Sequence, residues 1–341
     1  MQTVALQNPR SLSAPEPEPS RGRRYCLITP CRDEANYARR TLESIAKQTA
    51  RPALWIIVDD GSRDDTPQIL EEYARKLPYI RIIRRPDRGD RKLGGGVIEA
   101  FDEGYKTINP DDFDYVCKLD LDLDLPAGYF EELMNRMALE PRIGTCSGKP
   151  YMELDGRLIS EKCGDENSVG MIKFYRTSCF KQIGGFVREV MWDGIDCHRC
   201  RMLGWIAVSW DDPAIRFVHL RPMGTSHKNW WTGRVRHGAG QYFMGTGMIY
   251  MLASGVFRMS RPPLLVGGFA MLWGYVKKWL ARAPRYEDKE FRSFLRRYQW
   301  SCLLRGKARA TASLNEAQAA RWSPDVVPTR SVQPIPATTT F

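Results

Sequence analysis

Three features are scarce or missing in this sequence, and each absence excludes a class of protein. The apolar run from Leu264 to Val276 has only 13 residues, which is too short to span about 30 Å of hydrocarbon as a helix. The first 24 residues are interrupted by prolines and glutamates, so they lack the apolar segment of a signal peptide. The nine cysteines follow no regular spacing. These absences argue against a spanning helix and a disulfide framework, and they predict a cytoplasmic protein with reduced thiols.

Acidic residues are also unevenly distributed. Residues 216–309 contain 18 Lys or Arg but only three acids, whereas residues 1–215 contain 31 basic and 35 acidic residues. The formal net charge of +11 therefore arises in one segment, which predicts an anionic partner for that segment. With 43% hydrophobic residues among 341, the chain has enough apolar side chains for a sizeable core, and this excludes disorder over most of its length.

Between two ends that read as disordered tails, residues 1–24 and 310–341, short apolar runs alternate with helical patterns. The alternation predicts an α/β fold with a Rossmann-like, mostly parallel sheet and helices on both faces. We expect strands at Tyr25–Thr29, Leu54–Val58, Tyr79–Ile83 and Tyr115–Leu119, and helices at Asn36–Gln48, Thr66–Lys76, Val97–Thr107 and Tyr129–Leu139.

Acidic side chains follow three of these expected strands. Asp33 and Glu34 follow the first, Asp59 and Asp60 follow the second, and alternating aspartates at 120, 122 and 124 follow the fourth. Ligands of such sheets bind at the carboxyl ends of the strands, where these carboxylates would repel one another. A divalent cation such as Mg²⁺ or Mn²⁺ bound with a diphosphate would relieve the repulsion. The alternative is a set of exposed acidic turns.

The segments LITPCRDEANYARRTLESIAKQT, IIVDDGSRDDT and Leu119–Pro126 resemble, in this order, motifs of the family 2 glycosyltransferases, nucleotide-diphospho-sugar enzymes of the GT-A fold. The resemblance covers about Tyr25 to His219 and implies a GT-A domain over residues 25–222. By position it implies that Asp60 contacts the base, that Asp120 faces the ribose or the metal, and that Asp122 holds the metal. Further nucleotide-sugar contacts implied are Thr29, Pro30, Glu34 and Asp59. Asp33 stands where the family usually has Asn.

A glycine-rich stretch, residues 88–96, precedes the third expected helix. Backbone N–H groups at such a helix start can receive phosphate oxygens, so Arg91 and Gly95 are predicted donor contacts. A plain flexible turn is the alternative reading.

The later segment Trp192–Trp205 resembles the part of the family that carries the catalytic base, with Trp192 where the family has Glu. Asp193 is the first choice for the general base and Asp196 the second. His219 stands where many GT-A enzymes complete the metal shell, although a lone histidine is often structural. The resemblance implies a single inverting, metal-dependent displacement by a hexosyltransferase that uses a UDP-sugar.

Residues 223–309 are basic and contain apolar runs rich in Met, Trp and Phe. They predict a helical region that lies in a membrane interface, while a packing layer against the catalytic domain is the alternative. Neither Gln241-Tyr-Phe-Met nor Arg297-Tyr-Gln-Trp300 matches the motif of processive synthases, so we expect single transfer, with a lipid-linked glycan as acceptor in polysaccharide or cell-envelope synthesis. The expected location is cytoplasmic, peripheral on the inner face of a membrane.

Two other functions fit parts of the sequence. A nucleotidyltransferase shares a doubly wound sheet and an acidic metal site. A nucleic-acid-binding protein would share the pI near 9.2, but the basic third carries apolar runs instead of a recognisable nucleic-acid module, and we expect no nucleic-acid partner.

Overall fold

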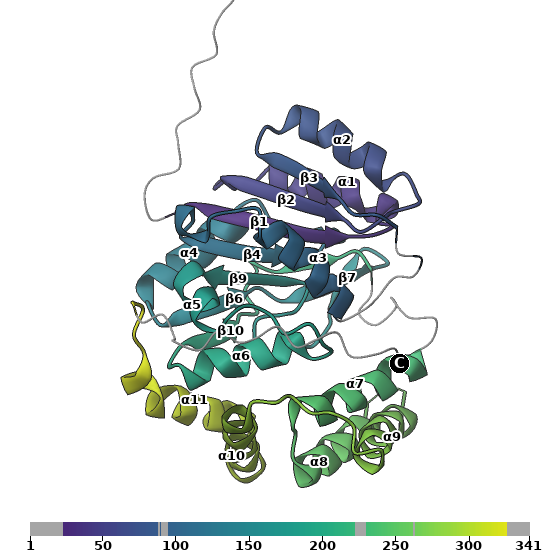
Figure 1. The fold of residues 1–341 in the computed structure, drawn as a ribbon, viewed down its shortest axis with the longest axis vertical. Helices are drawn as coiled ribbons and strands as arrows, with labels where there is room; N and C mark the ends of the chain where they lie inside the picture. The colour runs from purple at the N-terminus through teal and green to yellow at the C-terminus, as the bar shows by residue number, and fades with distance from the viewer. Residues whose placement is uncertain (1–22, 88, 90–94, 222–229, 262, 326–341) are drawn as a thin grey trace, which may run out of the picture.

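The computed structural model describes residues 23–325 except 88, 90–94, 222–229 and 262. Its centre is a seven-stranded sheet in the order β10-β6-β9-β4-β1-β2-β3 (Figure 1). The strands are β1 Tyr25–Cys31, β2 Leu54–Asp59, β3 Ile80–Arg84, β4 Tyr115–Leu119, β6 Ile143–Ser147, β9 Ile172–Arg176 and β10 Ile206–Ser209. Only β9 runs antiparallel to its neighbours β4 and β6, so the predicted mostly parallel sheet is confirmed.

Helices cover both faces of this sheet because successive side chains of a strand point to opposite faces. In β1, Tyr25 and Leu27 belong to the core on one side, with α1 Ala35–Ala46, α2 Thr66–Lys76 and α4 Tyr129–Leu139. Cys26 and Ile28 belong to the core on the other side, with α3 Gly95–Tyr105, α5 Thr177–Gln182 and α6 Trp192–Met202. The two cores hold the carboxyl ends of β1, β2 and β4 at one edge.

A second sheet of four strands, in the order β5-β11-β7-β8, lies beside that edge. Its strands are β5 Leu123–Asp124, β7 Pro150–Leu154, β8 Arg157–Ser160 and β11 Phe217–His219. Because β11 pairs with β5, His219 lies opposite Leu123. This register brings the predicted metal ligand next to the Asp120–Asp124 segment.

The C-terminal region is helical, as predicted. It consists of α7 Trp230–Met244, α8 Met248–Met259, α9 Val266–Leu280, α10 Lys289–Arg305 and α11 Lys307–Ala317. These helices lie together beyond α6, at the end of the molecule opposite β3 (Figure 1). Among the described residues, no helix combines the length and the apolar character that crossing a bilayer demands.

Glycines set the distance between α7 and α9. A Cβ on Gly238 would lie 1.8 Å from the carbonyl oxygen of Met271, and a Cβ on Gly274 would lie 2.0 Å from that of Val235. No side chain fits into such spaces, so the two backbones are in direct contact.

The prediction of a disordered tail from residue 310 onward is wrong for the start of that segment, which belongs to α11. Ala310 and Thr311 are buried within α11, and Thr311 Oγ1 shares a hydrogen bond of 2.7 Å with the hydroxyl of Tyr298 on α10. Trp322 packs edge-on against Trp205, with ring centroids 5.8 Å apart. Burial of these side chains offsets the entropy of ordering the segment. The expected boundary at 222 lies outside the described residues.

Candidate active site

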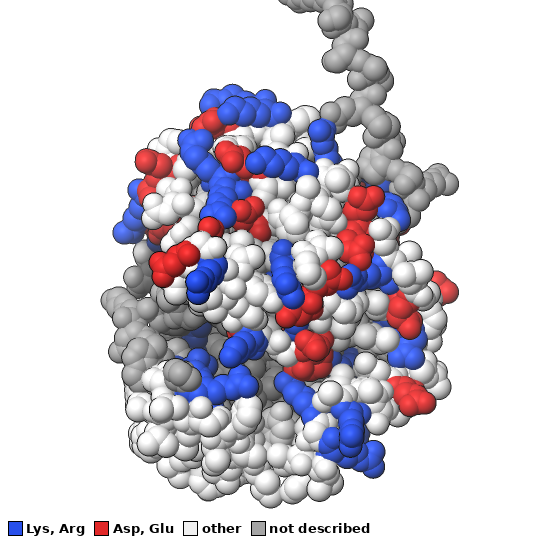
Figure 2. Space-filling model, turned by 180° about the vertical axis from the view of Figure 1, so that it is seen from behind, with Lys and Arg blue, Asp and Glu red and all other residues white. Residues whose placement is uncertain are grey.

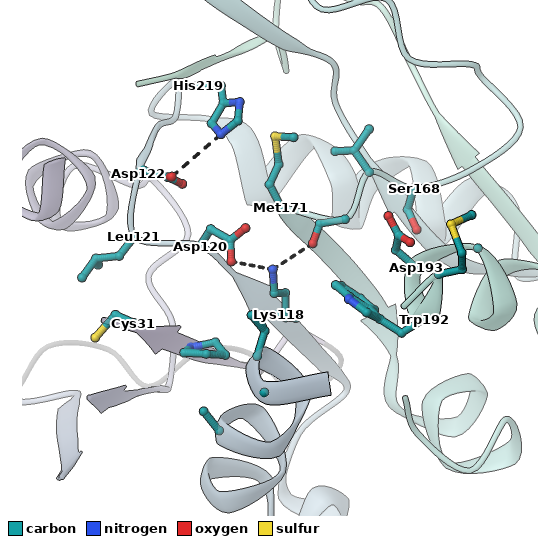
Figure 3. Close-up of a pocket in the computed structure, with 18 of the residues that line it drawn as sticks. Cys31, Lys118, Asp120, Leu121, Asp122, Ser168, Met171, Trp192, Asp193 and His219 are labelled. Atoms are coloured by element: carbon teal, nitrogen blue, oxygen red, sulfur yellow. Dashed lines mark hydrogen bonds and ion pairs between the residues drawn. The ribbon is translucent and has the colours of Figure 1, made fainter. Parts of the chain in front are cut away.

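A cavity of about 560 Å³ opens at the carboxyl ends of β1, β2 and β4 (Figure 3). Its walls come from the β1–α1 turn, the segment after β4, the loop before β9, the start of α6 and one side chain of α7, Arg236. Seven of the predicted site residues line it: Pro30, Glu34, Asp60, Asp120, Asp122, Asp193 and His219.

Lys118 organises the floor of the cavity. Its Nζ lies 2.5 Å from Asp120 Oδ1 and donates to the carbonyl oxygen of Gly170 at 2.9 Å. The same ammonium lies 5.2 Å from the ring centroid of Trp192. Lys118 belongs to β4 and is almost fully buried, so it fixes Asp120 against the loop before β9 and places a positive charge in the cavity.

His219 and Asp122 face each other across the cavity edge. Nε2 of His219 lies 3.8 Å from Asp122 Oδ2, while Nδ1 lies 2.8 Å from Glu161 Oε2. Burial alone lowers the pKa of His219, but the hydrogen bond to Glu161 and the charge of Asp122 outweigh it and raise the pKa. Glu161 thus orients the ring so that Nε2 points toward Asp122.

The carboxylate of Asp122 and the imidazole of His219 suit a divalent cation whose remaining coordination positions are filled by oxygens of a bound diphosphate or of water. Asp122 Oδ1 is buried and has no hydrogen-bond partner in the described structure, which is costly unless another group binds it. A carboxylate opposite an imidazole held by a second carboxylate is a recurrent arrangement around bound metals. In the part of the chain that the structure describes, no three such side chains are close enough to hold a metal by themselves, so diphosphate and water oxygens would supply the remaining ligands.

Electrostatics at Asp122 agree with this interpretation. Burial, followed by the like charge of Asp120, raises the pKa of Asp122, whereas His219 and Arg221 oppose the shift. Arg221 Nε lies 3.6 Å from Asp122 Oδ2, and the same guanidinium donates to Glu34. The site therefore holds two carboxylates near one another that favour an added positive charge.

Asp60 is held at the end of β2 by two arginines. Arg85 Nη1 donates to Asp60 Oδ1 at 2.8 Å, and Arg32 Nη1 donates to its carbonyl oxygen at 2.9 Å. Asp59 instead accepts from the backbone N–H of Ser62 at 2.9 Å and does not line the cavity. The first aspartate therefore shapes the turn, and the second faces the cavity.

Asp193 lies opposite the Asp120–Asp122 edge, in the first turn of α6 (Figure 3). Met191, the residue before this helix, adopts a left-handed conformation with φ of 70°. Burial raises the pKa of Asp193, and the positive charge of Lys173 partly opposes this shift. A half-buried carboxylate with a raised pKa inside a cavity is suited to accept a proton.

Asp196 lies one turn further along α6 but faces away from the cavity, in the protein interior. Its Oδ2 lies 2.5 Å from Nζ of Lys173 and accepts from the hydroxyl of Tyr175, and its Oδ1 accepts from the N–H of Cys197 at 2.6 Å. All of these partners are buried. The structure therefore gives Asp196 a place in an internal ion pair and leaves Asp193 as the candidate base.

Other predicted residues lie outside the cavity lining. Thr29 is buried and accepts a hydrogen bond of 2.9 Å from the indole N–H of Trp55. Gly95 packs against the backbone of Arg188, where a Cβ would lie 2.6 Å from the carbonyl oxygen; its neighbour Gly96 lines the cavity. Arg91 lies outside the described residues. Cys197 and Cys200, two cysteines separated by two residues, are both buried in α6.

Comparison with known proteins agrees with the sequence motifs. Residues 26–184 match the family model described as glycosyl transferase family 2. The chain is 25% identical over 183 residues to the putative glycosyltransferase EpsH of Bacillus subtilis (strain 168). The aligned region covers 51% of this chain and 48% of EpsH. The chain is 23% identical over 137 residues to a poly-β-1,6-N-acetyl-D-glucosamine synthase of Staphylococcus epidermidis, 40% of this chain and 30% of the synthase. The chain thus spans about half or less of the length of these relatives.

A solved structure shows the same fold. The chain is similar to GalNAc-T7, whose crystal structure contains UDP, GalNAc and Mn²⁺, with a TM-score of 0.53, 12% identity, and coverage of 84% of this chain and 58% of that one. At this identity the likeness concerns the fold alone.

Proposed function

Residues 26–184 form a family 2 glycosyltransferase domain of the GT-A fold, and from this premise we propose that the protein transfers a single sugar from a nucleotide-diphospho-sugar, a UDP-sugar, to a hydroxyl acceptor with inversion. One observation carries the proposal. A single cavity holds the Asp120–Asp122 edge on one side and Asp193 on the other (Figure 3), so a donor bound at that edge would present its sugar to the candidate base.

In the proposed reaction, Asp193 accepts the proton of the acceptor hydroxyl as the oxygen attacks the anomeric carbon. The bond from that carbon to the diphosphate oxygen breaks, and the nucleoside diphosphate leaves with the electron pair. Lys118 places a positive charge at the floor where the leaving group gains negative charge. Mg²⁺ or Mn²⁺ would be held by Asp122, Asp120 and His219 only together with diphosphate and water oxygens, and it would neutralise the diphosphate when bound.

Arg32 and Arg85 position Asp60 for the base of the nucleotide. Arg32 holds the backbone carbonyl of this residue and Arg85 holds its carboxylate. The carboxylate is therefore oriented before the donor binds, which lowers the entropic cost of recognition. Pro30 and Glu34, from the same edge, complete the proposed nucleotide contacts.

Release of nucleoside diphosphate tests the proposal. The protein should release UDP from a UDP-sugar only in the presence of Mg²⁺ or Mn²⁺, and a library of nucleotide-sugars would identify the donor. Pyrophosphate release from a nucleoside triphosphate and a sugar phosphate, with no sugar transfer, would instead support the nucleotidyltransferase alternative.

For the acceptor we propose a lipid-linked glycan of a polysaccharide or envelope pathway, reached from the cytoplasmic face of a membrane to which the protein attaches peripherally. Support comes from the C-terminal helices, whose end of the molecule shows a broad area without charged side chains, bordered by Lys and Arg, in Figure 2. Large apolar side chains are exposed there, with Val256 at 64% and Phe257 at 61%. Full solubility in low salt with no binding to anionic vesicles would contradict this attachment.

A further inference from the structure

A second cavity, of about 330 Å³, lies between α8, α9 and α10, away from the candidate active site. Its inner wall is polar: Tyr275 donates to the carbonyl oxygen of Thr246 at 2.7 Å, and Gln299 bonds both Thr246 and the N–H of Gly247. Arg285 and Arg296 also line it. The tyrosine and the glutamine both bond Thr246, so their polar groups are satisfied within the wall.

The cavity carries uncompensated positive charge. No Asp or Glu lines it, and the sequence contains none between Asp212 and Glu287. Arg285 packs its guanidinium 4.4 Å from the ring centroid of Tyr242, and its buried Nε has no hydrogen-bond partner within the described structure. Among the described residues, no ion pair includes either arginine of this cavity. Such a cavity is complementary to an anion.

Both arginines line the same cavity. Arg296 Nε bonds the carbonyl oxygen of Gly245 at 3.4 Å, and the guanidinium of Arg285 packs on the ring of Tyr242, so each side chain is held in place by its surroundings. Two guanidinium groups in one cavity of this size can bind one phosphate.

The rim of the cavity is apolar and exposed. Ile249, Trp279, Trp300 and Leu303 line the cavity, and each is also among the exposed large hydrophobic side chains. A cavity with a cationic wall and an apolar rim fits a ligand with an anionic head and an apolar tail.

Two helices extend this rim into a continuous apolar surface. On α8 the outward positions are Ile249, Leu252, Ala253, Val256 and Phe257, at the spacing of one helix face. On α9 they are Val266, Phe269 and Trp273, preceded by the N-cap residue Leu265 and followed by Lys277. Gly255 of α8 meets Leu272 of α9, where a Cβ would lie only 2.6 Å away. We call the nine apolar side chains the apolar face; basic residues at its ends, Arg258, Arg261, Lys277 and Lys278, suit an anionic surface.

We propose that this second cavity binds the phosphate head group of an anionic membrane lipid between Arg285 and Arg296, while the apolar face enters the acyl region beside it. The inference rests on the membrane attachment proposed above and adds a specific head-group site to it. A nucleic acid is disfavoured as the occupant because the surface beside the two arginines is apolar instead of basic.

Vesicle binding by the full chain tests the proposal. Vesicles of phosphatidylcholine alone are compared with vesicles that also contain phosphatidic acid, using wild type, the double variant Arg285→Gln/Arg296→Gln, and the control Arg297→Gln/Arg305→Gln. The control removes the same charge from exposed positions of α10 outside the cavity. We expect the affinity of the cavity variant for the phosphatidic acid vesicles to fall about thirtyfold, the effect of two cationic contacts at a membrane surface. The affinity of the control variant should fall less than about tenfold.

Several outcomes separate the possible failures. Equal losses in both variants would show unspecific charge attraction and overturn the site. Wild-type binding to both vesicle types without preference would also overturn it, but would leave membrane attachment standing. No binding to either would contradict the attachment itself, whereas release of UDP tests sugar transfer independently. Stabilisation by inorganic phosphate without preference for phosphatidic acid would indicate a free-phosphate site and overturn the lipid assignment.

A third variant, apart from the two arginines, keeps the test informative if the double variant fails to fold. Ala253→Gln places a neutral polar side chain on the exposed apolar face without touching the cavity. We expect it to weaken binding to both vesicle types equally and to retain the preference for phosphatidic acid. Loss of that preference in Ala253→Gln would mean that the apolar face, and not the two arginines, recognises the head group.

Discussion

The two aspartates of α6 predict opposite consequences when each is changed to asparagine. Asp193 lines the cavity, so Asp193→Asn removes the proposed base and should lower kcat by about a hundredfold to ten-thousandfold, which corresponds to about 3–5 kcal/mol of barrier. Its stability should be unchanged or higher, because burial raises the pKa of this carboxyl and the folded state therefore bears a cost for the charged form at neutral pH.

Asp196→Asn should do the reverse. Its side chain is 1% exposed and neutralises Lys173, whose side chain is 0% exposed. Removing one partner leaves a buried ammonium without its counter-charge, which costs about 3–5 kcal/mol of folding free energy. The fraction that remains folded should keep most of its turnover, because Asp196 faces away from the cavity.

Urea unfolding and a UDP-release assay on the same preparations distinguish the two effects. Adding Lys173→Met to Asp196→Asn should restore part of the lost stability by removing the orphaned charge. Full turnover in Asp193→Asn would refute the base assignment. Loss of turnover in Asp196→Asn without loss of stability would show that Asp196, and not Asp193, takes the proton.

Three further predictions concern the donor edge and the base. Asp122→Asn should abolish metal-dependent UDP binding measured by calorimetry, whereas Asp193→Asn should retain it; equal loss in both would contradict the division of roles. Glu161→Gln should weaken metal affinity about 10-fold to 100-fold through the loss of its bond to His219, while the exposed control Glu153→Gln should leave it unchanged. Because the pKa of Asp193 is raised and only its ionised form accepts a proton, kcat/KM at saturating metal should fall with decreasing pH before an ordinary aspartate (pKa about 3.9) is titrated; a rate that stays flat to that pH would contradict the raised pKa.

The first half of the fold follows from local patterns. The predicted bounds of α2, β4 and α4 agree with the structure at both ends, because their apolar periodicity and the breaks around them lie within a few consecutive residues. The acids at 60, 120 and 122 could be assigned to one site because parallel strands end at a common edge.

Other features of the site could not be predicted from the sequence, because they depend on contacts between residues that are far apart along the chain. Lys173 gives β9 a polar appearance, yet it is fully buried because Asp196 neutralises it from α6; a hydropathy pattern cannot identify such a strand. Glu161 lies in a polar stretch and gains its role only when β11 brings His219 to it, 58 positions away. Lys118 lies within the predicted strand Tyr115–Leu119, and only the structure shows its ammonium next to Asp120.

The direct backbone contact of α7 and α9 connects the candidate active site with the outer apolar face. Arg236 of α7 reaches the candidate active site, while Phe269 and Trp273 of α9 point outward. Because the backbones meet at Gly238 and Gly274 without intervening side chains, neither helix can slide without separating from the other. A displacement of α9 by a surface bound to it would therefore be passed to α7, the helix that carries Arg236.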